Sequence, residues 1–272
     1  MALIELQNVN FPFHGGGGLS DVSLKIERAG FVAVLGGNGA GKSTLAKILN
    51  ALISPTSGRI LVDGREEKDA YAIRRKVGLV LQDPDSQMVA DTVEDDVAFG
   101  PENLGLEPED IESRVRESLQ ICGIKELAGR SPSRLSGGQK QLVAIAGAIA
   151  MHPDCLVLDE ATSMLDPEGR RMVLSAIGRL NGNGMSVVMM THDPEEAALA
   201  KSVVVLDHGR VVLEGLPCDV FGAENGLDEF GVDIPMVYKL RKALKNSGVF
   251  LDKDIDTMDK IVKELERRRN GC

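Results

Sequence analysis

A short glycine-rich stretch carries one lysine and two hydroxyl side chains between an apolar run and a helical pattern. The apolar run, Phe31–Leu35, is typical of a buried strand, and residues 44–52 are typical of a helix. Glycines allow backbone N–H groups to close around phosphate oxygens, and the start of a helix adds partial positive charge. The stretch matches the spacing G-x-x-x-x-G-K-[ST] of a phosphate-binding loop. Its residues are Gly36, Gly37, Asn38, Gly39, Ala40, Gly41, Lys42, Ser43 and Thr44.

Within the loop, Lys42 is expected to reach the β- and γ-phosphates of a nucleotide, and the Ser43 hydroxyl to ligate Mg²⁺. Two adjacent carboxylates later in the chain could complete a site for nucleotide hydrolysis. Residues 155–158 are apolar and end in Asp159 and Glu160. We expect Asp159 to hold Mg²⁺ through water, and Glu160 to position and polarise an attacking water. Alone, the acids could be a solvated pair at a strand end, but the earlier phosphate-binding loop favours hydrolysis.

The elements that must position these groups alternate along the chain. Apolar strands separated by helices predict an α/β fold with a mostly parallel core sheet. An N-terminal antiparallel β part is expected over residues 3–11 and 22–26, and a hairpin around residues 207–209. Residues 83–134 are more polar and mostly helical in pattern. After about residue 222 the pattern changes to polar helices.

Composition excludes several classes of protein. The 272 residues are 43% hydrophobic and 26% charged, which excludes collagen-like, disordered and disulfide-scaffold chains. A net charge of −10, with two Tyr, seven Phe and no Trp, argues against a nucleic-acid surface. The four cysteines, Cys122, Cys155, Cys218 and Cys272, show no paired spacing, so we expect reduced thiols in a cytosolic chain.

No segment predicts membrane insertion. The longest apolar run covers residues 142–151, about half of the ~20 residues that a spanning helix needs. The N-terminal residues include acidic Glu5 and lack a basic region, so we expect no signal peptide. Any link to a membrane is therefore expected to come through a partner.

A five-residue motif gives the most specific signal. Residues 135–139 read LSGGQ and open the apolar helix that follows, with Ser136 as a good N-cap. Between a phosphate-binding loop and an Asp-Glu strand, this motif resembles the ATP-binding subunits of ABC transporters, and the resemblance covers about residues 3–221. It implies a P-loop NTPase fold of the ABC ATPase type, with a helical signature subdomain over about residues 83–150. It also implies ATP and Mg²⁺ as cofactors.

The resemblance assigns further roles position by position. Two cassettes would pair head to tail, so that Ser136 and Gly138 contact the γ-phosphate held by the other cassette. Gln82 corresponds to the glutamine that contacts Mg²⁺ and links to the membrane partner, and His192 to the histidine that touches the γ-phosphate. Residues 163–166 resemble the loop that crosses the dimer interface. Phe13 falls near the aromatic that stacks on adenine, and Phe11 is the competing candidate.

Some positions depart from the family pattern. Gly37 stands where proline is common, Met164 where alanine is common, and Leu142 where arginine is frequent, while Phe13 replaces a tyrosine. None of these changes removes a group that would touch phosphate. We therefore expect a competent ATPase.

Two other regions resemble one branch of the family. Residues 82–87 and 92–105 look like the energy-coupling-factor and cobalt-type ATPases, which serve importers of transition metals or vitamins. Residues 227–235 and 240–244 resemble the C-terminal extension of that branch. The resemblance thus implies a cassette over residues 1–221 and a helical extension over residues 222–272 that supports dimerisation.

The functional expectation is an ATPase subunit that drives an importer. Its implied partners are a second cassette, identical or paralogous, and integral membrane transporter subunits, which would hold it at the cytoplasmic face of the cell membrane. The alternative is a soluble, non-transport ABC ATPase that acts as a mechanical switch. The segment between Lys42 and Leu135 is too short for the long coiled coil of such proteins, and the acidic charge fits poorly with DNA. A cassette without hydrolysis is disfavoured by Glu160 and His192.

Overall fold

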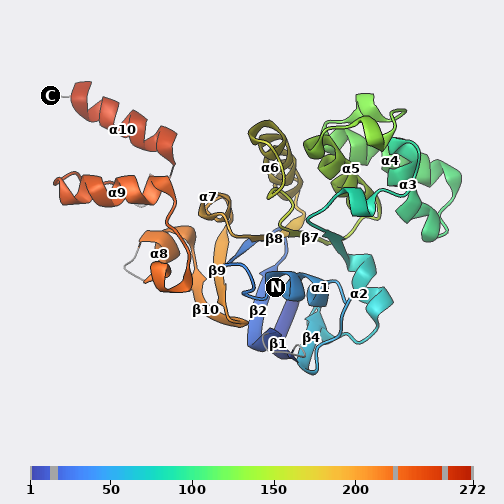
Figure 1. Cartoon of the computed structure of the whole chain (residues 1–272), viewed down its shortest axis with the longest axis horizontal. Coiled ribbons are helices and arrows are strands. Elements are labelled where there is room, and N and C mark those ends of the chain that lie inside the picture. Colours follow the sequence, from blue (N-terminus) through green and yellow to red (C-terminus); the bar gives the residue numbers. More distant parts are fainter. Residues whose placement is uncertain (1, 13–17, 223–225, 253–256, 271–272) are drawn as a thin grey trace.

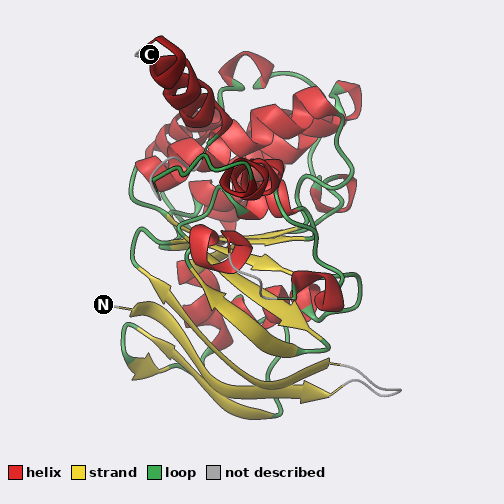
Figure 2. Cartoon of the chain, turned by 90° about the vertical axis from the view of Figure 1, so that its left-hand side faces the viewer, coloured by secondary structure: helices red, strands yellow, loops and turns green. Residues whose placement is uncertain are grey.

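Two β-sheets share a core beneath a layer of helices (Figures 1 and 2). The computed structural model describes residues 2–12, 18–222, 226–252 and 257–270. The smaller sheet is antiparallel, with the order β2-β1-β4-β5. Its strands are β1 (Ala2–Pro12), β2 (Gly18–Glu27), β4 (Ser57–Val62) and β5 (Arg65–Glu66).

The larger sheet has the order β10-β9-β3-β8-β7-β6 and is parallel except for the edge pair of β9 and β10. Its central strands are buried at every residue, because helices cover one face and the smaller sheet covers the other. This explains the continuous apolar runs in the sequence. The strands are β3 (Phe31–Leu35), β6 (Val77–Val80), β7 (Cys155–Asp159), β8 (Ser186–Thr191), β9 (Ser202–Asp207) and β10 (Arg210–Gly215).

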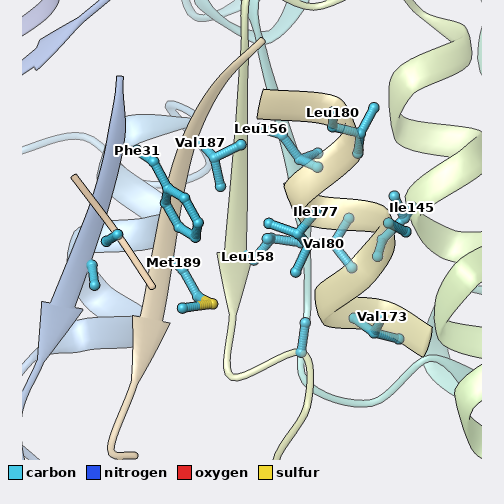
Figure 3. Packing of buried hydrophobic residues seen from close by; sticks show 14 of the residues in the cluster. Phe31, Val80, Ile145, Leu156, Leu158, Val173, Ile177, Leu180, Val187 and Met189 are labelled. Atoms are coloured by element: carbon cyan, nitrogen blue, oxygen red, sulfur yellow. The ribbon is translucent and has the colours of Figure 1, made fainter. Parts of the chain in front are cut away.

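The helices divide between the two faces of the larger sheet. Helix α1 (Lys42–Leu49) packs into the core between the sheets, and α6 (Pro167–Gly182) covers the opposite face. Figure 3 shows Val173, Ile177 and Leu180 of α6 against the side chains of the sheet. The other helices are α2 (Ala70–Lys76), α3 (Val93–Asn103), α4 (Pro108–Cys122), α5 (Gly137–Ala150), α7 (Pro194–Ala197), α8 (Pro217–Gly222), α9 (Met236–Asn246) and α10 (Met258–Asn270).

Side-chain caps fix where several helices begin. The Thr92 hydroxyl accepts a hydrogen bond from Asp95 N at the start of α3, and Asp166 Oδ1 accepts one from Gly169 N at 2.8 Å at the start of α6. Such caps satisfy N–H groups that have no partner within the helix. Helices α3, α4 and α5 form one group, separated from α9 and α10 across the molecule (Figure 1). This group lies within the residues expected to form the helical subdomain, whose bounds stay a prediction.

The C-terminal region packs on the cassette through buried side chains. The rings of Phe221 and Tyr238 lie with centroids 5.5 Å apart, and Met236 N donates a hydrogen bond to Glu195 Oε1 at 2.6 Å. Leu227, Val237 and Tyr238 are buried in the same hydrophobic cluster as the sheet. Residues beyond 222 thus contribute to the main core as well as to the surface.

The three described cysteines, Cys122, Cys155 and Cys218, are free. Burial raises the pKa of Cys122 and Cys155 to about 12, so both thiols stay protonated near neutral pH. No helix within the described ranges combines the length and the apolar character needed to cross a bilayer.

Candidate nucleotide-binding and hydrolysis site

The glycine-rich loop joins β3 to the first turn of α1. Gly41 is the N-cap of α1 with φ +106°, and a Cβ there would lie 2.9 Å from a methyl carbon of Leu19. A Cβ on Gly36 would lie 2.3 Å from the carbonyl oxygen of Leu206. Only glycine fits these two positions without displacing neighbours. The loop can therefore run close to the sheet and present the N-terminus of α1, where backbone N–H groups favour anions.

Lys42 is held at the centre of this loop. Its side chain is 4% exposed, and Nζ donates hydrogen bonds to the carbonyl oxygens of Gly36 and Gly37, each at 2.9 Å. Nζ also lies 3.1 Å from Glu160 Oε1. A buried ammonium group in this position is stabilised by the carboxylate, and the same position would suit an anionic phosphate oxygen.

Glu160 and His192 come from the ends of adjacent strands. Asp159 pairs with Met190 in the β7–β8 ladder, so the residues that follow the two strands are neighbours. His192 Nδ1 lies 3.4 Å from Glu160 Oε2. Glu160 has φ +49°, an unusual conformation for a residue with a side chain, and its N–H donates to the carbonyl oxygen of Met190 at 3.1 Å. The structure thus brings Lys42, Glu160 and His192 together.

Ser43 and Asp159 form the expected oxygen pair. Ser43 Oγ donates a hydrogen bond to Asp159 Oδ1 at 2.9 Å. Burial raises the pKa of Asp159; the Ser43 hydrogen bond opposes this effect, and the neighbouring Glu160 charge adds to it. A hydroxyl and a carboxylate oxygen are ligands that Mg²⁺ prefers, and Mg²⁺ commonly uses one or two protein ligands together with phosphates. The residues present therefore fit the ion.

Gln82 lies beside the segment that carries Glu160. Its Nε2 donates a hydrogen bond to Ser163 Oγ at 3.0 Å, and Ser163 Oγ donates in turn to the carbonyl oxygen of Glu160 at 2.9 Å. The structure therefore connects Gln82 to the loop after β7. Its role toward Mg²⁺ stays a prediction.

The LSGGQ motif forms the start of α5. Ser136 Oγ accepts from Gln139 N, and Gln139 Oε1 accepts from Ser136 N at 3.1 Å, which together make a capping box. A Cβ on Gly138 would lie 2.5 Å from Gly169 Cα, so this glycine allows α5 to pack directly on α6. Ser136 is exposed at the helix N-terminus, where an anion could reach it.

Phe11 and Phe13 are the two aromatic candidates for stacking on adenine. Phe11 is half-buried and packs against the core between the sheets. Phe13 lies outside the described residues. Its role as the adenine partner therefore stays a prediction.

Four polar residues near the site have no counterpart in the sequence predictions. They are Thr162, Arg170, Thr191 and Glu196, which form one hydrogen-bonded network next to Glu160 and His192. Thr162, Thr191 and Glu196 are buried, and Arg170 is half-buried. Each is an ordinary polar residue near a recognised motif, and no local spacing marks it. Only the tertiary packing brings the four together.

Residues 19–163 match the ABC transporter family. The chain belongs to this family, and it is an ATPase as the ATP-binding subunits of the family are. It is 47% identical to the energy-coupling factor transporter ATP-binding protein EcfA1 of Caldanaerobacter subterraneus subsp. tengcongensis, over 97% of this chain and 99% of the relative. It is 51% identical to EcfA1 of Symbiobacterium thermophilum, over 91% of this chain and 88% of the relative.

Solved structures agree with the fold. The cbiO1 protein of Clostridium perfringens, described as part of the ABC transporter complex cbiONQ, superposes with a TM-score of 0.77 at 34% identity. The match covers 89% of this chain and 99% of that one. The cassette MJ0796, solved as a dimer with ADP and Pi, gives a TM-score of 0.69 at 30% identity and covers 79% of this chain and 98% of its own. The expected ABC ATPase fold is confirmed.

Proposed function

We propose that this chain is the ATP-hydrolysing subunit of an energy-coupling-factor importer that takes up a micronutrient such as a transition metal ion or a vitamin. The names of the relatives support the importer class. The chemistry is supported above all by one observation, the contact of Lys42 Nζ with Glu160 Oε1 at 3.1 Å beside His192. This contact places two groups in one site: an ammonium group that can bind phosphate, and a carboxylate that can accept a proton from water.

The ion pair suggests how nucleotide binding prepares hydrolysis. The Glu160 carboxylate pairs with Lys42. A γ-phosphate that binds Lys42 would compete with this carboxylate, since both are anions. Glu160 would then be free to accept a hydrogen bond from the attacking water, with His192 next to it and close to the phosphate. Binding of ATP and orientation of water are therefore linked through one lysine.

Mg²⁺ would be held by Ser43 and Asp159, with Gln82 as a further contact. When bound, the ion would neutralise charge on the β- and γ-phosphates. Burial raises the pKa of Asp159, and nearby positive charge from Lys47 and Lys42 opposes this effect.

The exposed LSGGQ turn supports pairing of two cassettes. Ser136 is exposed at the N-terminus of α5, while Gly138 is buried against α6. An exposed helix N-terminus suits the γ-phosphate of a second cassette, which Ser136 and Gly138 would contact. Closure on ATP and reopening after hydrolysis would transmit force to integral membrane subunits at the cytoplasmic face of the membrane. The solved dimer of MJ0796 supports pairing as a property of such cassettes.

The substitution His192→Ala tests the catalytic part of this proposal. We expect turnover to fall by about 10²-fold, the scale of losing a positioned proton-transfer or phosphate-contacting group, while ATP affinity changes little. Turnover is measured with Mg²⁺-ATP and affinity by calorimetry. His208→Ala is the matched control, because His208 is exposed in the turn between β9 and β10. Equal turnover of both variants and the wild type would remove His192 from the site.

The C-terminal extension gives a separate prediction. Deletion of residues 222–272 should retain ATP binding, because every nucleotide-contacting motif precedes it, but should weaken pairing without nucleotide. Since Leu227, Val237 and Tyr238 are buried in the main core, a second variant keeps them and replaces the exposed Phe250 and Val262 with serine. This double substitution should raise the monomer–dimer dissociation constant in sedimentation about tenfold or more. An unchanged constant would show that the tail does not join cassettes.

A further inference from the structure

A buried carboxylate outside the nucleotide-contacting motifs joins the segments that carry Glu160 and His192. Glu196, on α7 beside β8, is 3% exposed. Its Oε1 accepts a hydrogen bond from Thr162 Oγ1 at 2.6 Å, and its Oε2 accepts one from Thr191 Oγ1 at 2.7 Å. Thr162 follows Glu160 by two residues, and Thr191 directly precedes His192. One carboxylate therefore contacts both segments.

The charge of this carboxylate is balanced from α6. Arg170 Nε lies 2.9 Å from Glu196 Oε1, and Arg170 also forms an ion pair with Asp193. Asp193 N donates a hydrogen bond to Thr191 Oγ1 at 3.0 Å. A buried charge is tolerated only when it is paired and hydrogen-bonded, and both oxygens of Glu196 are used in this way. These hydrogen bonds and ion pairs restrain the positions of the side chains that make them.

The conformation of Glu160 shows why such a restraint matters. A residue with a side chain at φ +49° lies in an unfavourable backbone conformation and is held there by its surroundings. The hydrogen bond from Glu160 N to the carbonyl oxygen of Met190 restrains one side of the residue. The bond from Thr162 to Glu196 restrains the other side. Thr191 donates to the same carboxylate. Glu196 therefore links the segment after β7 to the end of β8.

We propose that Glu196 is a positioning residue for ATP hydrolysis, holding Thr162 and Thr191 so that Glu160 and His192 keep their 3.4 Å contact. The proposal rests on the roles proposed above for Glu160 and His192. Glu196 does not touch the nucleotide in this account. Its effect should therefore appear in turnover and not in ATP affinity.

The test removes each hydroxyl while keeping the side-chain shape. Thr162→Val and Thr191→Val should each lower kcat about tenfold or more, since a small misplacement of catalytic groups is costly, and leave the ATP dissociation constant within about twofold. The conservative variants Thr162→Ser and Thr191→Ser retain the hydroxyl and should restore most of the turnover. Glu196→Gln, which removes the charge at constant volume, should also lower kcat.

A matched control lies at the opposite end of the same strand. Ser186, 1% exposed at the start of β8, accepts a hydrogen bond from Ala29 N at 3.1 Å. Ser186→Ala removes a buried hydroxyl far from the catalytic end of the strand, so it should lower the melting temperature without lowering kcat. This comparison separates positioning from loss of stability.

The outcomes are distinct. If both valine variants keep wild-type kcat, or if Ser186→Ala lowers kcat as much as they do, the positioning role is wrong. If Glu160→Gln and His192→Ala also keep wild-type turnover, the proposed site itself is wrong. Loss of turnover in Glu160→Gln alone, with normal valine variants, overturns only the role of Glu196.

Discussion

Replacing Lys42 with alanine should raise the ATP dissociation constant by about 100-fold or more. Lys42 Nζ is buried among Gly36 O, Gly37 O and Glu160, so it is already placed where a phosphate would bind. A change of 100-fold corresponds to about 2.7 kcal/mol, within the range of about 1.5–3 kcal/mol for a hydrogen bond to a charged group. Without the lysine, the Glu160 carboxylate would also face the anionic phosphates directly, which adds repulsion.

Calorimetric titration with Mg²⁺-ATP measures this effect. Lys25→Ala is the control, because Lys25 lies on the surface of β2 in an exposed pair with Glu5. We expect its affinity to equal that of the wild type. Near-normal affinity of Lys42→Ala would show that phosphates do not bind in this loop.

Glu160→Gln should bind ATP at least as tightly as the wild type and hydrolyse it at least 10²-fold more slowly. The amide cannot accept a proton from water, and loss of a general base costs about 10²–10⁴-fold. The same change removes the anion that pairs with Lys42, so phosphate no longer competes with a carboxylate for the lysine. Tight binding without turnover should make an ATP-bound dimer accumulate.

Turnover is followed by phosphate release and the dimer by light scattering with ATP and Mg²⁺. Glu112→Gln on α4 is the control, because it neutralises an acid in an exposed ion pair with Arg116. It should resemble the wild type in both measurements. Wild-type turnover of Glu160→Gln would assign the base to another residue.

The sequence predicted the elements whose signal is local. The buried strand Phe31–Leu35 was predicted to the residue and β7 to within one residue of its end, because their apolar runs are unbroken and a motif follows each of them. β5 and α2 were not predicted. Residues 65–69 are charged and suggest a loop, and Ile73 is the one buried residue of α2, so its helical pattern is weak.

In the candidate site, too, the residues with a local sequence signal were predicted and the others were not. Lys42, Ser43, Asp159 and Glu160 could be predicted because each lies in a motif whose spacing carries its own chemistry. Arg170 and Glu196 could not, because they meet only where α6, α7 and the ends of β7 and β8 converge. Glu196 follows a proline and another glutamate, a pattern typical of a solvated helix start. Tertiary packing alone makes it a buried link.

An importer ATPase is distinguished from a soluble ATPase by ATP turnover of the complex that a tag on this chain recovers from detergent-solubilised membranes. We expect a wild-type complex that contains integral membrane proteins and hydrolyses Mg²⁺-ATP. We expect a Glu160→Gln complex of the same composition with at least 10²-fold lower turnover. Equal turnover of the two complexes, or recovery of the chain without any integral membrane protein, would show that the chain is not an importer ATPase with Glu160 as its base.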